Sequence, residues 1–178
     1  MNTTTNYNLP QWEDSDRVTR ESVNGAMSSI DSAIANASPW VKLLDVTVAE
    51  NTAQIDLDVS GFDLTQYAFL LVYPRGSATS SPARVRYNNI ATESYSVSGQ
   101  TEKYAASLSF GGVAGYLLVH LFENRVCTEV RNFTSSNYGA SGGNTTEVNV
   151  STLQTINITP QSGYIMEGSS FRVYGFKL

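Results

Sequence analysis

The sequence has few of the residues on which enzymes and metal sites depend. It contains one cysteine and one histidine among 178 residues. A single cysteine, Cys127, excludes a disulfide within the chain and a zinc site built from several cysteines. A Ser-His-Asp triad would have to use His120, which lies in an alternating strand pattern that favours a half-buried structural role. We therefore expect no enzymatic activity, no bound metal and no cofactor.

Charged residues are also scarce, at 15% of the chain, and their balance is acidic, with 11 Lys and Arg against 16 Asp and Glu. The basic residues are scattered, whereas nucleic-acid binding needs them clustered, so no nucleic-acid partner is expected. No stretch approaches the roughly 18 apolar residues of a membrane span. The first five residues carry no positive charge and no apolar run follows them, so no secretion signal is expected.

One clear helical pattern lies near the beginning of the sequence. Apolar residues recur there at spacings of four, three, four and three, which is the heptad seam of a coiled coil. The seam residues are Val23, Met27, Ile30, Ile34 and Ala37. Asp14 or Ser15 is expected to cap the first turn. Ser38–Pro39 should end the helix, because a residue before proline is pushed out of helical geometry.

The seam predicts self-association, as a homotrimer around a shared axis. Two heptads are marginal for an isolated coiled coil, and Gly25 lowers helix stability by roughly 1 kcal/mol. The alternative is that the helix packs on the β-domain of its own chain.

A polar arm with a few large apolar residues precedes the helix. Tyr7, Leu9 and Trp12 stand among Asn, Thr and Gln, where they cannot form a core by themselves. We expect them to dock into a groove on a partner protein or a neighbouring subunit, with Trp12 as the main anchor. The alternative is that Trp12 folds back onto its own chain.

From Val41 onward the periodicity changes from helical to alternating. Ile55, Leu57 and Val59, for example, alternate with polar residues. Turn signals such as Asn88–Asn89 separate about ten short strand candidates. We predict a mainly β fold, an antiparallel β-sandwich of the jelly-roll type preceded by one N-terminal α-helix. The expected division is 1–38 for attachment and oligomerisation and 39–178 for the sandwich.

A long loop is expected at Ser135–Thr146, followed by a strand at Glu147–Val150. Rigid sandwiches often carry recognition on such loops. Within this loop Asn137, Tyr138 and Asn144 are candidates for binding a glycan, because an aromatic ring beside amide groups suits a sugar. The alternative is a surface loop that binds nothing.

The N-terminal residues resemble a known group of phage proteins. Asn6–Arg20 reads NYNLPQWEDSDRVTR, and Asn24 and the segment Ile30–Ile34 follow it. This resembles the N-terminal segment of tail-fibre-like and other minor virion proteins of phages and prophages of gut Firmicutes, in which Tyr-x-Leu-x-x-Trp-x-x-x-Asp-Arg-Val leads into a helix carrying Asn and Ile-Asp-x-Ala. The final residues, Gly168–Leu178, loosely resemble the last strand of phage fibre and appendage sandwiches.

The resemblance implies a structural virion component, often trimeric, whose N-terminal segment faces the particle. We therefore expect a tail-fibre, head-fibre or other appendage protein, assembled in the bacterial cytoplasm. Other virion proteins would bind its N-terminus, and its outward sandwich would contact a host-surface glycan. The alternative is a stand-alone, lectin-like carbohydrate-binding module, although a free lectin has no need of a helix with a seam.

Overall fold

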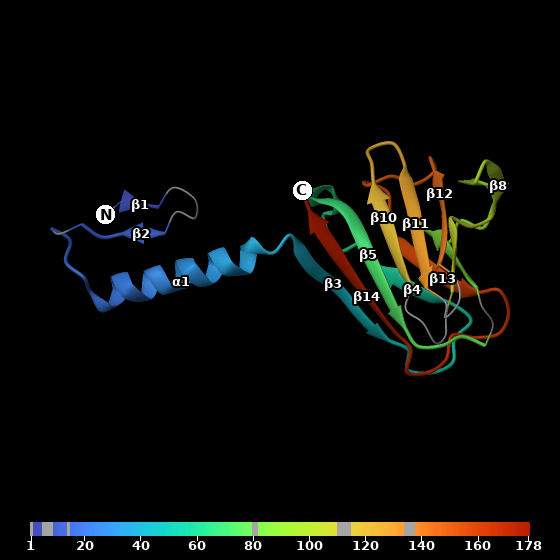
Figure 1. Ribbon diagram of the computed structural model, residues 1–178, viewed down its shortest axis with the longest axis horizontal. Helices are drawn as coiled ribbons and strands as arrows, with labels where there is room; N and C mark the ends of the chain where they lie inside the picture. The colour runs from blue at the N-terminus through green and yellow to red at the C-terminus, as the bar shows by residue number, and fades with distance from the viewer. Residues whose placement is uncertain (1, 5–8, 14, 80–81, 110–114, 134–137) are drawn as a thin grey trace. The chain divides into compact units, whose positions relative to one another are not determined.

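The computed structural model describes all residues except 1, 5–8, 14, 80–81, 110–114 and 134–137. The chain forms two compact units, Met1–Pro39 and Trp40–Leu178. The first contains the helix and the second is an antiparallel β-sandwich (Figure 1). The predicted mainly β fold with one N-terminal helix is confirmed.

The first unit consists of a short β-hairpin and a helix. Strand β1 (Asn2–Thr3) pairs antiparallel with β2 (Pro10–Gln11), and helix α1 spans Arg20–Ala37. After β2 the chain reverses and α1 runs alongside the hairpin (Figure 1). The helix ends where Ser38–Pro39 predicts. The hairpin is not foreseen from the sequence, because strands of two residues show no alternation.

The predicted start of the helix is wrong. Asp14 lies outside the described residues, and Ser15 is not the cap, since Thr19 is the N-cap residue. The Thr19 side chain accepts from the Ser22 amide at 3.2 Å, and the Ser22 hydroxyl accepts from the Thr19 amide at 2.9 Å. This is a capping box in which serine replaces the usual Glu or Gln. The Asp16 carboxylate instead holds a turn before the helix, because it accepts a backbone amide three residues earlier.

The second unit is built from two antiparallel sheets. The larger has eight strands in the order β3-β14-β5-β10-β11-β12-β7-β8, and the smaller has four in the order β4-β13-β6-β9. The strands of the larger sheet are β3 (Trp40–Thr47), β5 (Tyr67–Arg75), β7 (Tyr95–Val97), β8 (Gln100–Glu102), β10 (Tyr116–Leu121), β11 (Val126–Phe133), β12 (Tyr138–Thr145) and β14 (Ser170–Lys177). Those of the smaller sheet are β4 (Ile55–Asp58), β6 (Ala83–Tyr87), β9 (Ala106–Leu108) and β13 (Thr155–Pro160). A 3-10 turn, η1 (Leu64–Gln66), precedes β5.

The strand order is that of a jelly roll with two added strand pairs. Without β7–β8 and β11–β12, two four-stranded sheets remain, β3-β14-β5-β10 and β4-β13-β6-β9. The first of the eight strands then pairs with the last, and the second pairs with the seventh in the opposite sheet, as in a jelly roll. The added strands all extend the larger sheet beyond β10, which explains its greater width.

A continuous apolar layer lies between the sheets. On β6, Ala83, Val85 and Tyr87 are fully buried and alternate with half-exposed arginines. Leu117 and Val119 on β10 face them from the larger sheet and are also fully buried. Because successive strand residues point to opposite faces, alternate residues enter the layer and the others form the two outer faces.

Two tyrosine hydroxyls cross this layer and find partners inside it. The hydroxyl of Tyr87 on β6 hydrogen-bonds to that of Thr128 on β11, which joins the smaller sheet to the larger one. The hydroxyl of Tyr95 on β7 accepts from the Tyr87 amide at 3.0 Å and donates to the Ile90 carbonyl at 3.2 Å. Burial raises the pKa of the Tyr87 phenol, so the group stays neutral.

The loop expected at Ser135–Thr146 is wrong for most of its length. Strand β12 pairs with β11 in continuous register from Phe133–Tyr138 to Val126–Thr145. The Gly- and Ser-rich sequence conceals this strand because it lacks apolar alternation. Position 142 requires glycine, because a Cβ there would overlap the carbonyl oxygen of Thr128.

The strand expected at Glu147–Val150 is also wrong, because this segment forms a turn. The side-chain oxygen of Asn149 accepts from the amides of Ser151 at 2.9 Å and Thr152 at 3.2 Å. An asparagine that bonds to amides ahead of it offers the backbone an alternative to a strand ladder.

Thr128→Val should lower the free energy of unfolding by about 1–3 kcal/mol, because the Tyr87 hydroxyl loses its partner in a dry layer. Adding Tyr87→Phe to this variant should recover part of the loss, since both polar groups are then gone. Urea unfolding of the four proteins in this double-mutant cycle measures the coupling. Additive losses from the two single changes would show that the hydrogen bond does not join the sheets energetically.

Candidate functional site

The seam of α1 is exposed within the first unit. Val23 is 41% exposed, Met27 60%, Ile30 37% and Ile34 69%, and Ala37 is exposed as well. Single apolar residues on a surface need no explanation, but a row along one helix face marks a contact surface. The described part of the chain does not bury this row.

Small residues occupy the side of α1 that is buried within the unit. Ala26 is 6% exposed, and Ser29 and Ala33, spaced three and four residues further on, are half-buried. The arm places Leu9 against the C-terminal half of α1, where they form a shallow apolar cleft of about 250 Å³. Its lining residues are Leu9, Ile30, Ala33, Ile34 and Ala37. The arm thus covers one flank of the helix, and Leu9 borders Ile30 and Ile34, which are still 37% and 69% exposed.

The three residues expected to dock are used differently. Leu9 is half-buried and contributes to the cleft beside α1, so part of its surface is used inside the unit. Trp12 is 38% exposed and stays available to a partner. Tyr7 lies outside the described residues.

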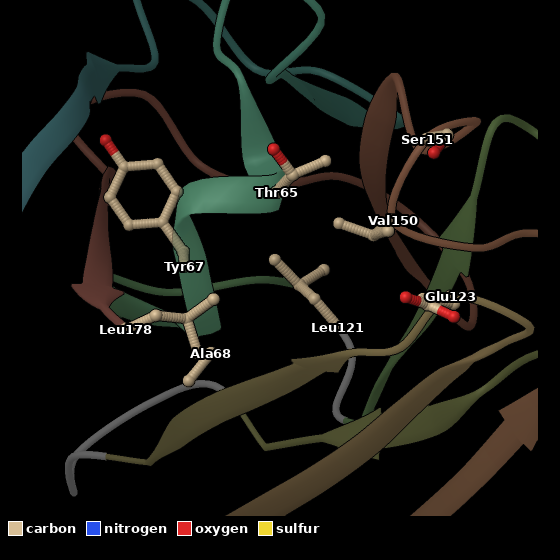
Figure 2. Close-up of a pocket in the computed structure, with 8 residues that line it drawn as sticks. All are labelled: Thr65, Tyr67, Ala68, Leu121, Glu123, Val150, Ser151 and Leu178. Carbon is tan, nitrogen blue, oxygen red and sulfur yellow. The ribbon is translucent and has the colours of Figure 1, made fainter.

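An open cleft of about 430 Å³ lies at the end of the sandwich where β5 begins and β10 ends. It is lined by Thr65, Tyr67, Ala68, Leu121, Glu123, Val150, Ser151 and Leu178. Figure 2 shows the Tyr67 ring on one side, the Glu123 carboxylate on the other, and Leu121 between them in this view. The cleft therefore combines an aromatic ring and apolar side chains with a carboxylate and hydroxyls.

A second cleft of about 340 Å³ adjoins the first and shares Thr65, Val150 and Ser151 with it. Asp63 holds the turn between them, because its carboxylate accepts from the Thr65 hydroxyl at 2.6 Å and the Gln66 side-chain amide at 2.9 Å. These hydrogen bonds, that of Thr65 first, hold the pKa of Asp63 below its usual value. Their stabilisation is present at neutral pH and is lost as the pH falls through that lowered pKa.

Sequence reasoning missed these clefts. No local signal in the sequence shows that Thr65, Glu123 and Ser151 meet in space. The residues it does select are separated: Asn137 lies outside the described residues, and Tyr138 and Asn144 lie near opposite ends of β12. The structure therefore places Tyr138 and Asn144 in a strand and not in a ligand loop.

His120 and Cys127 face each other across β10 and β11 on the outer face of the larger sheet. The His120 Nε2 atom lies 4.0 Å from a carboxylate oxygen of Glu129, and its ring lies 5.8 Å from that of Phe69 between centroids. Among the described residues, no group of three or more His, Cys, Asp or Glu could hold a metal ion.

In the part of the chain that the structure describes, no helix is long and apolar enough to cross a membrane. Comparison of the chain with protein-family models, curated proteins and solved structures gives no match. Its function must therefore be inferred from its own residues and geometry.

Gly25→Ala should stabilise the seam-bearing helix by about 1 kcal/mol. Gly25 lies inside α1, and a Cβ there would meet nothing within 4 Å. The melting of the far-ultraviolet circular dichroism signal of the helix should move to higher temperature. Gly61→Ala is the matched control, because its Cβ also meets nothing within 4 Å but lies in the sandwich. Equal shifts in the two variants would contradict a helix-specific effect.

Proposed function

We propose that this chain is a structural component of a bacteriophage virion, a fibre or other appendage protein. Its N-terminal unit joins three copies and mounts them on the particle, and its jelly roll is displayed outward. The observation that carries the proposal is the exposed seam of Val23, Met27, Ile30 and Ile34 on a capped helix in a unit separate from the sandwich. The resemblance of Asn6–Arg20 to phage attachment segments supports the same function.

The composition of the seam favours a coiled coil of three helices. Ile30 occupies an a position of the heptad and Ile34 a d position. Isoleucine at both a and d shifts coiled coils toward trimers and tetramers. The polar face of α1, with exposed Asn24, Ser28 and Ser32, points away from the seam and stays in water. A single folded chain leaves the large apolar side chains of the seam exposed, and association would remove them from water.

Trp12 is the proposed anchor on the particle. It is 38% exposed, lies in the arm and is not part of the seam. Buried aromatic anchors dominate many protein interfaces, at roughly 2 kcal/mol or more each. A groove on another virion protein would bury its ring.

The second candidate function is a carbohydrate-binding module, which the cleft of Figure 2 favours. Tyr67 offers an aromatic ring, and Glu123 and Ser151 offer polar groups at the same opening. Jelly rolls occur in both virion and lectin domains, so the fold is compatible with either function. The two functions are also compatible with each other, as adhesion to a host-surface glycan by a mounted appendage.

Ile30→Asp should convert the homotrimer to monomers, because three carboxylates would be buried at one axis. Ser32→Asp adds the same charge to the opposite side of α1 and should leave the trimer intact. Light scattering at high micromolar concentration measures both masses. If the unmodified protein is monomeric under these conditions, the prediction that the seam forms a trimer is wrong.

Trp12→Ala should reduce incorporation into particles by at least tenfold while the trimer persists. The measurement is the amount of the protein that copurifies with particles assembled in the presence of the variant. Val18→Ala, at an exposed residue between Trp12 and α1, is the control. Normal incorporation of the Trp12 variant would show that the mounting contact does not depend on Trp12.

Glu123→Gln should weaken any glycan binding by roughly 1.5–3 kcal/mol, the usual contribution of a hydrogen bond to a charged group. Glu50→Gln, in the exposed turn after β3, should bind as the unmodified protein does. A glycan array followed by titration calorimetry identifies the ligand and measures the difference. Equal binding by both variants would place the ligand outside this cleft.

A further inference from the structure

The two outer faces of the sandwich differ in chemistry. On the smaller sheet, the side-chain amide of Asn157 donates to Asp56 at 2.6 Å, and the Arg86 side chain donates to the Lys103 carbonyl at 3.0 Å. Such a polar, hydrogen-bonded face is expected where an antiparallel sheet meets water. The larger sheet departs from this pattern at one end.

At that end, Trp40, Phe176, Phe69 and His120 form an aromatic row across four strands. They are successive register partners on β3, β14, β5 and β10. The rings of Phe69 and Phe176 are stacked with centroids 4.9 Å apart, and Trp40 packs edge-on at 5.1 Å from Phe176. Trp40 is 39% exposed, and β3 is the edge strand of its sheet, so none of the strands that the structure describes pairs with its outer side (Figure 1).

The same face becomes ionic further along β3 and β14, beginning at Lys42. Asp45 accepts from Lys42 at 3.1 Å and pairs with Arg172 at 3.4 Å. Beyond them lie Thr47 and Ser170, which are also register partners. Polarity therefore rises along these strands away from Trp40, and the aromatic surface is at the end where the sandwich begins.

The chain between the seam and the aromatic row is very short. Ala37 is the last seam residue, and Trp40 follows after Ser38 and Pro39 only. Three residues span at most roughly 11 Å. If three helices meet along the seam, the three copies of Trp40 must start close to the same axis.

We propose that the aromatic row of each sandwich packs against the rows of its neighbouring copies, next to the end of the helical seam. This inference rests on the proposed trimer and extends it into the sandwich. The occupant of the row is a second copy of this chain, because the short connection holds the first residue of each row within roughly 11 Å of the last seam residue in any trimer formed by the seam. The contact would cover Trp40 and the exposed edges of the Phe69 and Phe176 rings.

The contact involves the face and not the free edge of β3. Continuous pairing between β3 strands of two copies would bring Lys42 and Asp45 into the new interface, and charged residues on an edge strand disfavour such pairing. The aromatic row carries no such obstacle on β3, β14 and β5. Packing of rings also suits three-fold symmetry, whereas pairing of two edges does not close around three chains.

Tryptophan fluorescence tests the inference in the full chain. The protein has two tryptophans, so Trp12→Phe leaves Trp40 as the only reporter. Acrylamide quenching is compared between this protein and the same protein carrying Ile30→Asp, with the mass of each measured by light scattering. We expect the quenching constant of Trp40 to be at least twofold lower in the trimer than in the monomer.

A second reporter controls for general effects of association. Tyr164 is 51% exposed and lies in the loop that leads into β14, at the end of the sandwich opposite to Trp40. Tyr164→Trp in a chain carrying Trp12→Phe and Trp40→Phe should quench equally in trimer and monomer. A reduction as large as that at Trp40 would show that the shielding is not local, and would overturn the inference.

The remaining outcomes separate the row from the seam. If acrylamide quenches Trp40 equally in the trimer and the monomer, the proposed contact between rows is wrong, while the trimer formed by the seam stands. A Trp40 already shielded in the Ile30→Asp monomer would show that its own chain covers the row. A monomeric protein without Ile30→Asp would refute the trimer, and the inference with it.

Discussion

The sandwich depends on one dry layer between two sheets, and few polar atoms enter it. Where a polar group does enter, it meets another, as the hydroxyls of Tyr87 and Thr128 do across the layer. Because alternate residues of β6, β10 and the other central strands are committed to this layer, only the outer faces are free to differ. The polar face of the smaller sheet and the aromatic row of the larger one are two uses of that freedom.

The proposed function divides the work between two kinds of surface. Exposed apolar side chains on α1 and at Trp40 lie on either side of a connection of two residues, Ser38 and Pro39. The clefts around Thr65 and Glu123 combine apolar side chains with hydroxyls and a carboxylate, and they are the surface proposed for a glycan. Copies of the chain and a soluble ligand would therefore meet different residues.

The sequence predicts those parts whose pattern is local and periodic. The seam and the alternation of Ile55, Leu57 and Val59 are read directly, and the jelly-roll type follows from many short strands. Strand β12 is missed because Gly142 lies close against β11 and Gly143 close against β7, and these glycines leave no apolar alternation. The N-cap at Thr19 is missed because serine takes the place of the usual Glu or Gln. The cleft is missed because only the folded chain brings its residues together.

The jelly-roll order also determines when the sandwich can become complete. Among the described strands, β3 pairs with β14 alone, as in the pair Trp40 and Phe176, and β4 pairs with β13 alone. The first strands of the domain therefore cannot pair until the last strands are present. Contacts between residues far apart in sequence also slow folding. The helix α1, whose hydrogen bonds are local, has no such delay. During synthesis, a helix ready to associate would precede a sandwich whose edge strand β3 still lacks its partner.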